Sequence, residues 1–464
     1  RPTCGELRML GVNALEEPDA LRARVGLISH KPMLYGDLTA QENLAFFASL
    51  YGMAGAAAQA RIDDLLRLVE LDHRRNDCVR TFSRGMQQRL SIARALISDP
   101  EIVLLDEPYS GLDPHAAELF DQLIDRVREG RTFVMVSHDL EKGYDLCTHA
   151  LILAQGAVVV CAQKADVDRG AFRDLYWRPW EWGWRRWRRS GRACVVVTWG
   201  RRVPLSLRVP PLARVLSASR APSDAPAKPS TSKPSAFAQY RALLGKDVRQ
   251  ELRTREMLTS MVVYSLLVLT VYGAALAQVG DKLQVVSFSG GLLWALIVFT
   301  SLLGLNRSFS HETESGCLEG ILLAPVDRAV VFLAKTTSNL LFLLAVELVT
   351  VPLFFVFFLS GAPLSATAPM IVLPLLVGTV GVAGVGTLLS TMAIDTRGKD
   401  VLLAILFIPV AFPLLYACVS ATGVALAGVE GTFATFWRSL ALAGTYDVVM
   451  IAAAWGLYEF VLDS

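Results

Sequence analysis

Six apolar runs in the second half of the chain restrict its fold more than any other feature of the sequence. Each run is long enough to cross a bilayer as a helix when tilt is allowed for. They lie near residues 257–278, 288–305, 338–359, 368–393, 401–421 and 440–461. Hydrophobic residues make up 53% of the chain and charged residues only 19%, which is the balance of a membrane protein. The sequence therefore predicts an all-α polytopic membrane domain with six transmembrane helices over residues 236–464.

The basic residues around these runs favour one side of the membrane. On that side they precede the first run, follow the second and follow the fourth: Arg241, Lys246, Arg249, Arg253, Arg255, Arg307, Arg328, Lys335, Arg397 and Lys399. The other side has little beyond Lys282 and Arg438. Because cytoplasmic loops carry the excess of Lys and Arg, we expect both termini to lie in the cytoplasm.

Residues 1–165 have a different character. Short β-branched runs such as VGLIS and FVMVS alternate with amphipathic stretches such as IDDLLRLVEL. This alternation is typical of a parallel sheet with helices on its faces, so we expect an α/β domain. Seven cysteines are scattered through the chain without a C-x-x-C pair, so neither a zinc site nor a disulfide framework is predicted.

Two segments of the α/β domain carry groups suited to nucleotide chemistry. VLLDEP places Asp106 and Glu107 at the end of a buried strand, where one carboxylate can hold Mg²⁺ through water and the next can orient an attacking water. Ser83-Arg84-Gly85 opens the helical stretch QQRLSIARALI, so backbone N–H groups face outward where phosphate could dock. Taken alone, a helix start of this kind is usually a serine N-cap.

The order FSRGM, VLLDEP, SGLD and VSHD removes this ambiguity, because it resembles the ATP-binding cassette family across residues 1–165. The resemblance implies an α/β P-loop-NTPase-like cassette that uses ATP and Mg²⁺ and forms a dimer with a second cassette subunit. It makes Ser83 and Gly85 part of the signature motif, which completes the ATP site of the opposing subunit. It also makes Asp106 the Walker B carboxylate that holds Mg²⁺, and Glu107 the catalytic base.

The same resemblance implies roles for five further positions. Asp113 becomes the D-loop residue and His138 the switch histidine that touches the γ-phosphate, whereas an isolated strand-end histidine is ordinarily satisfied by the backbone. Arg84 and Met86 stand where the commonest signature has Gly and Gln, a change that leaves the backbone donors in place. His30 stands where most of the family has the Q-loop glutamine, and its imidazole can bond a water of the Mg²⁺ shell, while direct ligation is not expected.

No G-x-x-x-x-G-K-[ST] motif, the loop that cradles phosphates in this family, occurs in the sequence. The pair Gly245-Lys246 lies in a basic segment without the preceding glycine, and we attribute it to chance. In the family the loop comes before a segment like RPTCGELRMLG, so we expect that about forty residues including the loop were lost before Arg1. Neither residues 1–464 alone nor their homodimer is then expected to hydrolyse ATP.

Residues 166–235 are expected to join the two parts. The run YWRPWEWGWRRWRRSGR keeps no helical or strand period, and its composition suits out-of-frame translation of GC-rich DNA between two adjacent genes. A membrane-interface anchor and an ordinary disordered linker are the alternatives. The following APSDAPAKPSTSKPS is rich in Pro, Ser and Ala, which predicts a linker.

The membrane part resembles the B subunit of the bacterial haem exporter of cytochrome c maturation, from about residue 236 onward. The resemblance is carried by KDVRQELRTREMLTSM, LLGLNRSF and ESGCLEGILLAPVDRAVVFLAKTTSNLLF. The first part resembles the ATP-binding A subunit of the same system in SHKPMLYGDLTAQENL and FSRGMQQRLSIARAL. The resemblance implies two fused subunits at the bacterial inner membrane, with a cytoplasmic ATP-binding part. It also implies two partners, a haem-handling membrane subunit and a periplasmic haem chaperone.

Between the second and third runs, Glu319 to Asp327 predicts a short amphipathic helix followed by a turn at Pro325. By resemblance to exporters of this architecture it is the coupling helix, which docks on the ATPase. The alternative is a loop helix that lies on the membrane surface.

Two acidic residues fall within the apolar runs. Glu347 lies near the middle of the third run, where an ionisable side chain marks either a substrate or proton pathway or a hydrogen bond between helices. Asp447, nearer the outer end of the last run, is expected to be interfacial.

Haem leaves no trace in the residues themselves. All six histidines (His30, His73, His115, His138, His149 and His311) lie outside the predicted spans, so none is available there as an axial ligand. Two readings therefore remain open besides direct haem export. One is a machine that uses ATP to release haem-loaded chaperone, and the other is a general exporter of another substrate.

Overall fold

The computed structural model describes residues 6–137, 139–154, 157–170, 172–173, 194–200, 235–276, 282–308, 312, 315–360, 367–393, 399–427 and 433–463. Contacts divide the chain into two compact units. The first comprises Arg1–Ala238 with Ser315–Val326, and the second comprises Gln239–Glu314 with Asp327–Ser464. The short segment 315–326 therefore belongs to the first unit although the second unit flanks it on both sides in the sequence.

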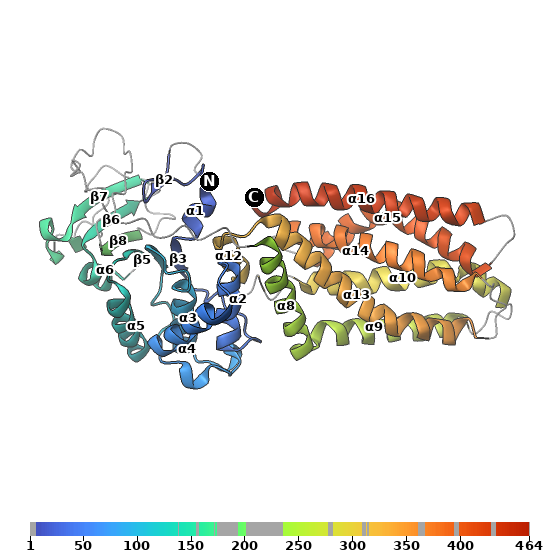
Figure 1. Cartoon of the computed structure of the whole chain (residues 1–464), viewed down its shortest axis with the longest axis horizontal. Helices are drawn as coiled ribbons and strands as arrows, with labels where there is room; N and C mark the ends of the chain where they lie inside the picture. The colour runs from blue at the N-terminus through green and yellow to red at the C-terminus, as the bar shows by residue number, and fades with distance from the viewer. Residues whose placement is uncertain are drawn as a thin grey trace. The chain divides into compact units, whose positions relative to one another are not determined.

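A six-stranded sheet forms the centre of the first unit (Figure 1). Its strands β3 (Val25–Ile28), β4 (Ile102–Asp106) and β5 (Thr132–Ser137) are parallel, which confirms the expected parallel sheet over this region. The order continues with β8 (Cys194–Gly200), β6 (His149–Ala154) and β7 (Ala157–Gln163), each antiparallel to its neighbours. A separate hairpin, β1 (Arg8–Met9) and β2 (Val12–Asn13), precedes the sheet in sequence.

The helices of the first unit are α1 (Pro18–Arg22), α2 (Ala40–Leu50), α3 (Gly55–Leu68), α4 (Arg84–Ala95), α5 (Pro114–Val127), α6 (Leu140–Leu146) and α12 (Cys317–Leu323). Short 3₁₀ turns lie at η1 (Asp72–Arg74), η2 (Val79–Thr81) and η3 (Lys164–Asp166). Several starts are fixed by side-chain caps. At α2, for example, the Thr39 hydroxyl accepts from Glu42 N while the Glu42 carboxylate accepts from Thr39 N, a complete capping box.

The strand β8 alters the expected extent of the linker. Residues 166–235 are predicted to be a Trp/Arg-rich and then Pro/Ser-rich linker. Within this segment the backbone of Cys194–Gly200 pairs with β5 on one side and β6 on the other. The run CVVVT is rich in β-branched residues, which favour extended backbone. Residues 194–200 of the predicted linker thus lie in the sheet, while the Trp/Arg-rich run, and the Pro/Ser-rich run apart from Ser235, lie outside the described residues.

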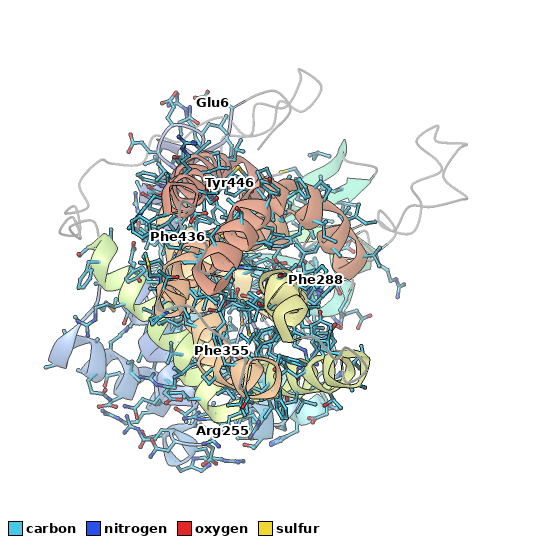
Figure 2. The ribbon with its side chains drawn as sticks, turned by 90° about the vertical axis from the view of Figure 1, so that its right-hand side faces the viewer. Glu6, Arg255, Phe288, Phe355, Phe436 and Tyr446 are labelled. Carbon is cyan, nitrogen blue, oxygen red and sulfur yellow. The ribbon has the colours of Figure 1, made fainter. Side chains whose placement is uncertain are left out.

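The second unit is a bundle of long helices: α8 (Ala236–Thr254), α9 (Glu256–Leu276), α10 (Lys282–Ser308), α13 (Arg328–Phe358), α14 (Val372–Met392), α15 (Lys399–Ala427) and α16 (Phe433–Asp463), with a 3₁₀ turn η6 (Ala368–Ile371) before α14. All but α8 contain a stretch long and apolar enough to cross a membrane, and the six candidate spans match the six predicted runs. Exposed apolar side chains such as Phe288 cover the outside of the bundle, whereas Phe436 is buried (Figure 2). This distribution suits contact with lipid.

Helix α14 occupies the centre of the bundle. Within its span 72% of the residues are buried, against 17% in the span of α16. Close packing depends on small residues: a Cβ added at Gly378 would lie 2.0 Å from Cη2 of Trp294 on α10. The indole N–H of Trp294 donates to the Thr422 hydroxyl of α15 at 3.0 Å, so this contact fixes three helices together.

Candidate functional site

The carboxyl ends of β3 and β4 bring together two of the predicted Mg²⁺-handling residues. Asp106 ends β4, and His30 follows β3 by two residues at the same edge of the sheet. His30 Nδ1 lies 3.9 Å from Asp106 Oδ2, and both side chains are about half exposed. Parallel strands place ligand-binding groups at this edge in α/β proteins. The roles of His30 and Asp106 stay predictions, and the structure shows that the two side chains lie close together.

A hydrated Mg²⁺ fits this pair better than a directly held ion does. Among the described residues, no group of three or more His, Cys, Asp or Glu side chains is placed to hold a metal ion. Mg²⁺ ordinarily keeps several waters and is held by one or two carboxylates together with substrate phosphates. In the predicted arrangement, Asp106 and His30 would supply one side of such a site through water.

Glu107 directly follows β4 in an unusual backbone conformation. Its φ is +50°, in the left-handed region that non-glycine residues seldom adopt. Its N–H donates to Val136 O on β5 at 3.0 Å, and its carbonyl accepts from Ser110 N at 3.0 Å. The backbone of Glu107 is thus pinned to the edge of the sheet where β4 ends, as a residue held in a strained position for function would be. Its predicted role as catalytic base stays a prediction.

His138, the predicted switch histidine, lies outside the described residues. Its neighbours mark where β5 ends: the Ser137 hydroxyl accepts from Asp139 N at 3.0 Å, and the Asp139 carboxylate caps α6 by accepting from Lys142 N at 3.1 Å. The chain therefore turns from strand to helix at this point, on the same edge of the sheet as Asp106.

The predicted signature residues lie at the start of α4. The Ser83 hydroxyl caps the helix by accepting from Met86 N at 3.3 Å, which is the serine N-cap expected of such a sequence on its own. A Cβ added at Gly85 would lie 3.0 Å from Cβ of Ala116 at the start of α5. The Arg84 guanidinium covers Gly111, where a Cβ would lie 2.7 Å from its Nη1. The signature therefore packs against the SGLD segment.

The SGLD segment is itself fixed by a cap. The Asp113 carboxylate accepts from Ala116 N at 2.8 Å and begins α5. The buried Gln88 of α4 donates to Pro108 O at 3.1 Å, which ties the signature helix to the residues that follow Glu107. The segments FSRGM, VLLDEP and SGLD, which are separate in sequence, thus form one connected block.

Helix α12 contains most of the predicted coupling segment and packs against Phe47 of α2 and Met33 within the first unit. A Cβ added at Gly320 would lie 3.3 Å from the Phe47 ring of α2 and 3.5 Å from Cβ of Met33. Cys317 is fully buried, whereas Glu319 on the same helix is exposed. Asp327 lies beyond the helix and caps α13, where its carboxylate accepts from Ala329 N at 2.9 Å.

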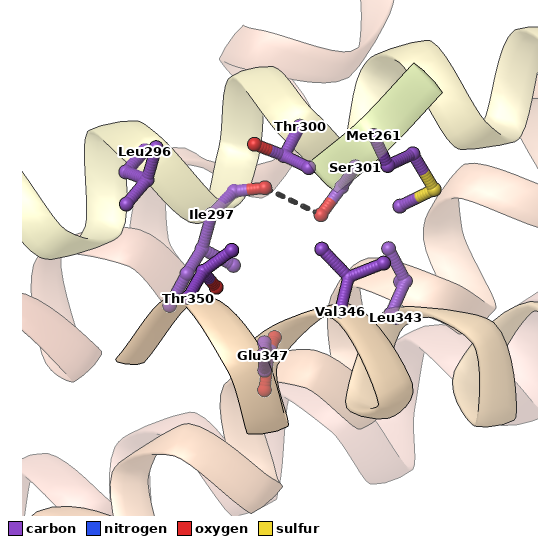
Figure 3. A pocket seen from close by; sticks show the side chains of 9 residues that line it. All are labelled: Met261, Leu296, Ile297, Thr300, Ser301, Leu343, Val346, Glu347 and Thr350. Atoms are coloured by element: carbon purple, nitrogen blue, oxygen red, sulfur yellow. Dashed lines mark hydrogen bonds between the residues drawn. The ribbon is translucent and has the colours of Figure 1, made fainter. Parts of the chain in front are cut away.

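Glu347 lies within the bundle on α13. Its Oε1 accepts from the Thr379 hydroxyl of α14 at 2.7 Å, a hydrogen bond between helices. It also lines a small cavity together with Thr300, Ser301, Thr350 and apolar side chains of α9, α10 and α13 (Figure 3). The cavity has room for about one water molecule. Glu347 therefore makes a hydrogen bond between helices and also lines a partly polar cavity, which are the features named by the structural and the pathway hypotheses respectively.

The expectation that Asp447 is interfacial is wrong. The side chain is only 6% exposed and packs between α16 and α14, where a Cβ added at Gly381 would lie 2.0 Å from its Oδ1. A neighbouring glycine without a side chain leaves the space that the carboxyl occupies. Sequence position alone placed this residue near the outer end of the run, but it did not reveal that α14 is the central helix.

Sequence reasoning also missed a group of buried charges at one end of the bundle. The segment around α8 reads as a basic, amphipathic approach to the membrane. In the structure its buried side includes Gln239, Lys246, Asp247 and Glu251, which recur at helical spacing. A polar stripe with the period of a helix is the signal that could have shown that this face meets other charged groups.

Comparisons with known proteins divide the chain in the same way. One family model, described as an ABC transporter, matches residues 1–110, and another, described as a CcmB protein, matches residues 238–456. The ABC transporter ATP-binding protein NatA of Bacillus subtilis (strain 168) is 36% identical over 177 residues, which are 38% of this chain and 69% of that protein.

Two relatives carry the description Nod factor export ATP-binding protein I. The one from Cupriavidus pinatubonensis (strain JMP 134 / LMG 1197) is 33% identical over 167 residues, or 36% of this chain and 51% of its own. The one from Rhizobium meliloti (strain 1021) is 35% identical over 156 residues, or 33% of this chain and 47% of its own. The chain thus spans about half the length of these relatives.

Proposed function

The chain belongs to the ABC transporter family, with an ABC transporter domain and a CcmB domain in one polypeptide, and from this premise we propose that it serves cytochrome c maturation at the bacterial inner membrane. In this proposal ATP hydrolysis drives either haem export or the release of haem-loaded chaperone. The observation that carries it is the CcmB match over residues 238–456 on the same chain as the ABC transporter match over residues 1–110.

Residues of the first unit divide the nucleotide chemistry between them. Asp106 and His30 hold Mg²⁺ through water, and Glu107 orients and deprotonates the water that attacks the γ-phosphate. Bound Mg²⁺ supplies charge neutralisation between the phosphates. By the family resemblance, His138 contacts the γ-phosphate. These assignments follow the family resemblance, and the short distance between His30 and Asp106 supports them.

The signature residues serve the opposing subunit. The backbone N–H groups at Ser83, Arg84 and Gly85 face its γ-phosphate, while the Met86 N–H donates to the Ser83 hydroxyl and so holds the turn in place. Asp113 lies at the junction between the two subunits. The packing of Arg84 over Gly111 and the cap at Asp113 support this role, because they hold the start of α4 and the SGLD segment in one block. The phosphate-cradling loop is absent from residues 1–464, so those residues by themselves lack one half of the site.

The membrane part connects this chemistry to the bilayer. With both termini in the cytoplasm, α12 faces the cytoplasm and is the coupling helix, with Glu319 on its exposed side and Pro325 and Asp327 at its end. Its contacts with Met33 and Phe47 support this assignment. We propose that residues 166–235, apart from β8, connect the two parts. The proposed limits of the two domains are residues 1–165 and 236–464.

Between the two mechanisms we favour release of haem-loaded chaperone, in concert with a separate haem-handling membrane subunit. None of the six candidate spans contains a histidine, so the described spans offer no imidazole ligand along a haem route. Glu347 then bonds α13 to α14. If haem or a proton instead passes through the bundle, Glu347 and its cavity offer that route one carboxyl group and three hydroxyl groups.

Inverted membrane vesicles test the proposal. The chain is extended at its amino end by a phosphate-loop segment and is assembled with the haem-handling subunit and the haem-loaded chaperone. ATP should release chaperone, and Glu107→Gln should stop the release. If vesicles with the extended chain as their only added protein accumulate haem when ATP is supplied, and Glu347→Ala stops this without lowering ATPase activity, direct export is correct and the favoured mechanism is wrong.

A further inference from the structure

Four charged side chains form a buried cluster at one end of the helical bundle. The charge cluster consists of Lys246 and Asp247 on α8, Glu312, and Lys335 on α13, with side chains between 1% and 9% exposed. Lys246 Nζ lies 2.6 Å from Asp247 Oδ1 and also contacts Glu312 Oε1. Lys335 Nζ lies 2.9 Å from Glu312 Oε1 and 3.2 Å from Asp247 Oδ1. Each cation therefore contacts both anions.

The charges in the cluster balance, two against two. Burial removes the hydration of each ion, and mutual attraction repays that loss only where the geometry is good. The pKa of the Asp247 carboxyl is lowered: burial alone would raise it, but the ammonium groups of Lys246 and Lys335 together more than offset burial. Apolar side chains of similar volume would stabilise such a place at least as well. The presence of buried ion pairs of this kind is better explained if they fix one arrangement of chain segments than if they raise the stability of the fold.

The cluster joins three helices and one short segment. The Ser338 hydroxyl of α13 donates to Asp247 Oδ2 of α8 at 3.0 Å, and Lys335 Nζ donates to Ser308 O at the end of α10 at 3.4 Å. Glu312 is held through Oε1, while its buried Oε2 has no hydrogen-bond partner among the described residues. Charge attraction through a single oxygen is thus what ties Glu312 to α8 and α13.

Glu312 occupies a particular place along the chain. The chain leaves the second unit after Glu314, contributes Ser315–Val326 to the first unit, and returns at Asp327. Glu312 lies two residues before the point of departure, and Lys335 lies eight residues after the point of return. The contact between Glu312 and Lys335 therefore holds together the two ends of the segment that contains α12.

We propose that the charge cluster is a positioning site that fixes the chain leading into and out of α12, so that α12 stays seated against Met33 and Phe47. The four charged residues of the cluster affect the position of α12, and they do not contact nucleotide or haem. The cluster holds two points of the chain against α8. One is Glu312, before α12, and the other is Lys335 on α13, after it. Loss of this tie lets α12 lift from the cassette while the bundle itself stays folded.

Two native cysteines report on the two units separately. Cys317 on α12 and Cys418 on α15 are both fully buried. The full chain in membranes is treated with N-ethylmaleimide, and mass spectrometry follows the labelling of each thiol over time. Because a buried thiol reacts only when its surroundings open, the labelling rate measures local opening. A change at Cys317 without a change at Cys418 means that α12 has loosened in a folded bundle.

The key variant is the neutralised pair Glu312→Gln/Lys335→Met, which leaves no uncompensated charge because the contact between Lys246 and Asp247 remains. It should label Cys317 about tenfold faster than the wild type or more, at an unchanged Cys418 rate. The pair Lys246→Met/Asp247→Asn keeps the contact of Glu312 with Lys335 and should accelerate Cys317 less. Arg241→Met, which removes an exposed charge from α8, should leave both rates unchanged.

Three outcomes overturn the proposal. The first is wild-type protection of Cys317 in the Glu312→Gln/Lys335→Met pair. The second is a parallel rise at Cys317 and Cys418, which makes the cluster a stabiliser of the bundle and nothing more. The third is a larger effect of Lys246→Met/Asp247→Asn than of the first pair, which moves the anchor away from Glu312. None of these measurements uses ATP or haem, so they stand apart from the test of the proposed function.

Discussion

Gly320 allows the strongest test of how α12 packs. A Cβ at this position would lie 3.3 Å from two carbons of the Phe47 ring and 3.5 Å from Cβ of Met33. One carbon therefore fits once the ring shifts by a few tenths of an ångström, and a larger side chain does not fit. Gly320→Leu places three further carbons in this contact. Overpacking of this kind costs about 1–3 kcal/mol, which corresponds to roughly 5- to 150-fold in the equilibrium between seated and lifted α12.

Labelling of Cys317, three residues earlier on the same helix, measures that equilibrium. The matched control is Gly320→Ala, because it shares the gain of up to about 1 kcal/mol in helix propensity but adds only the carbon that fits. We expect Ala to label no faster than the wild type and Leu to label faster by the factor above. Glu319→Leu, which adds the same side chain on the exposed side of α12, should change little. Equal rates for Gly320→Leu and the wild type would refute the packing of α12 described here.

Three further predictions concern other parts of the chain. Asp113→Ala removes the cap of α5 and should lower the free energy of unfolding of the first unit by about 1 kcal/mol in urea titration, whereas His115→Ala on the same turn should not; equal effects would mean that the cap is unimportant. The pKa of Asp247 is lower in the folded protein than in the unfolded one. The contribution of this carboxylate to the free energy of unfolding is therefore complete above the unfolded pKa of about 3.9, and it is lost as the pH falls through the folded pKa. The thermal midpoints of the wild type and Lys246→Met/Asp247→Asn should therefore differ by a constant amount from neutral pH down to about 4, and a gap that already narrows at pH 6 contradicts this. Finally, Glu319→Cys should react with an impermeant thiol reagent from the cytoplasmic side, and Ser360→Cys, at an exposed position, should react from the outer side. The reverse pattern inverts the topology and removes the coupling role of α12.

The parts of the fold that follow from local pattern were predictable. VLLDEP reads as a buried strand that ends in two carboxylates, and the structure places Asp106 at the end of β4 with Glu107 next to it. The six apolar runs became six candidate spans because hydropathy over about 20 residues is itself the property that decides insertion. Their ends were less predictable: the third span begins at Arg328, ten residues before the predicted start, because α13 continues beyond the apolar part.

The parts that depend on distant partners were not predictable from one sequence. β8 lies after a Trp/Arg-rich run of unusual composition, and only its pairing with β5 and β6 shows that it belongs to the sheet. The burial of Asp447 depends on Gly381 of another helix, which leaves room for its carboxyl group. This contact cannot be read from the sequence around Asp447, so the residue looked interfacial. Lys246 looked like one more cytoplasmic charge, since its partner Glu312 lies 66 residues away in sequence and Lys335, which shares that partner, lies 89 residues away.

The central claim is that the first unit is the hydrolytic part of an ABC ATPase, and one measurement tests it most directly. Mg²⁺-dependent ATPase activity is measured for residues 1–464, for the same chain extended by a phosphate-loop segment, and for the extended chain with Glu107→Gln. Residues 1–464 should show nothing above background, the extended chain should hydrolyse ATP, and Glu107→Gln should abolish that activity because the attacking water loses its base. Undiminished hydrolysis in the Glu107→Gln variant would contradict the account, since Glu107 then has no part in the reaction.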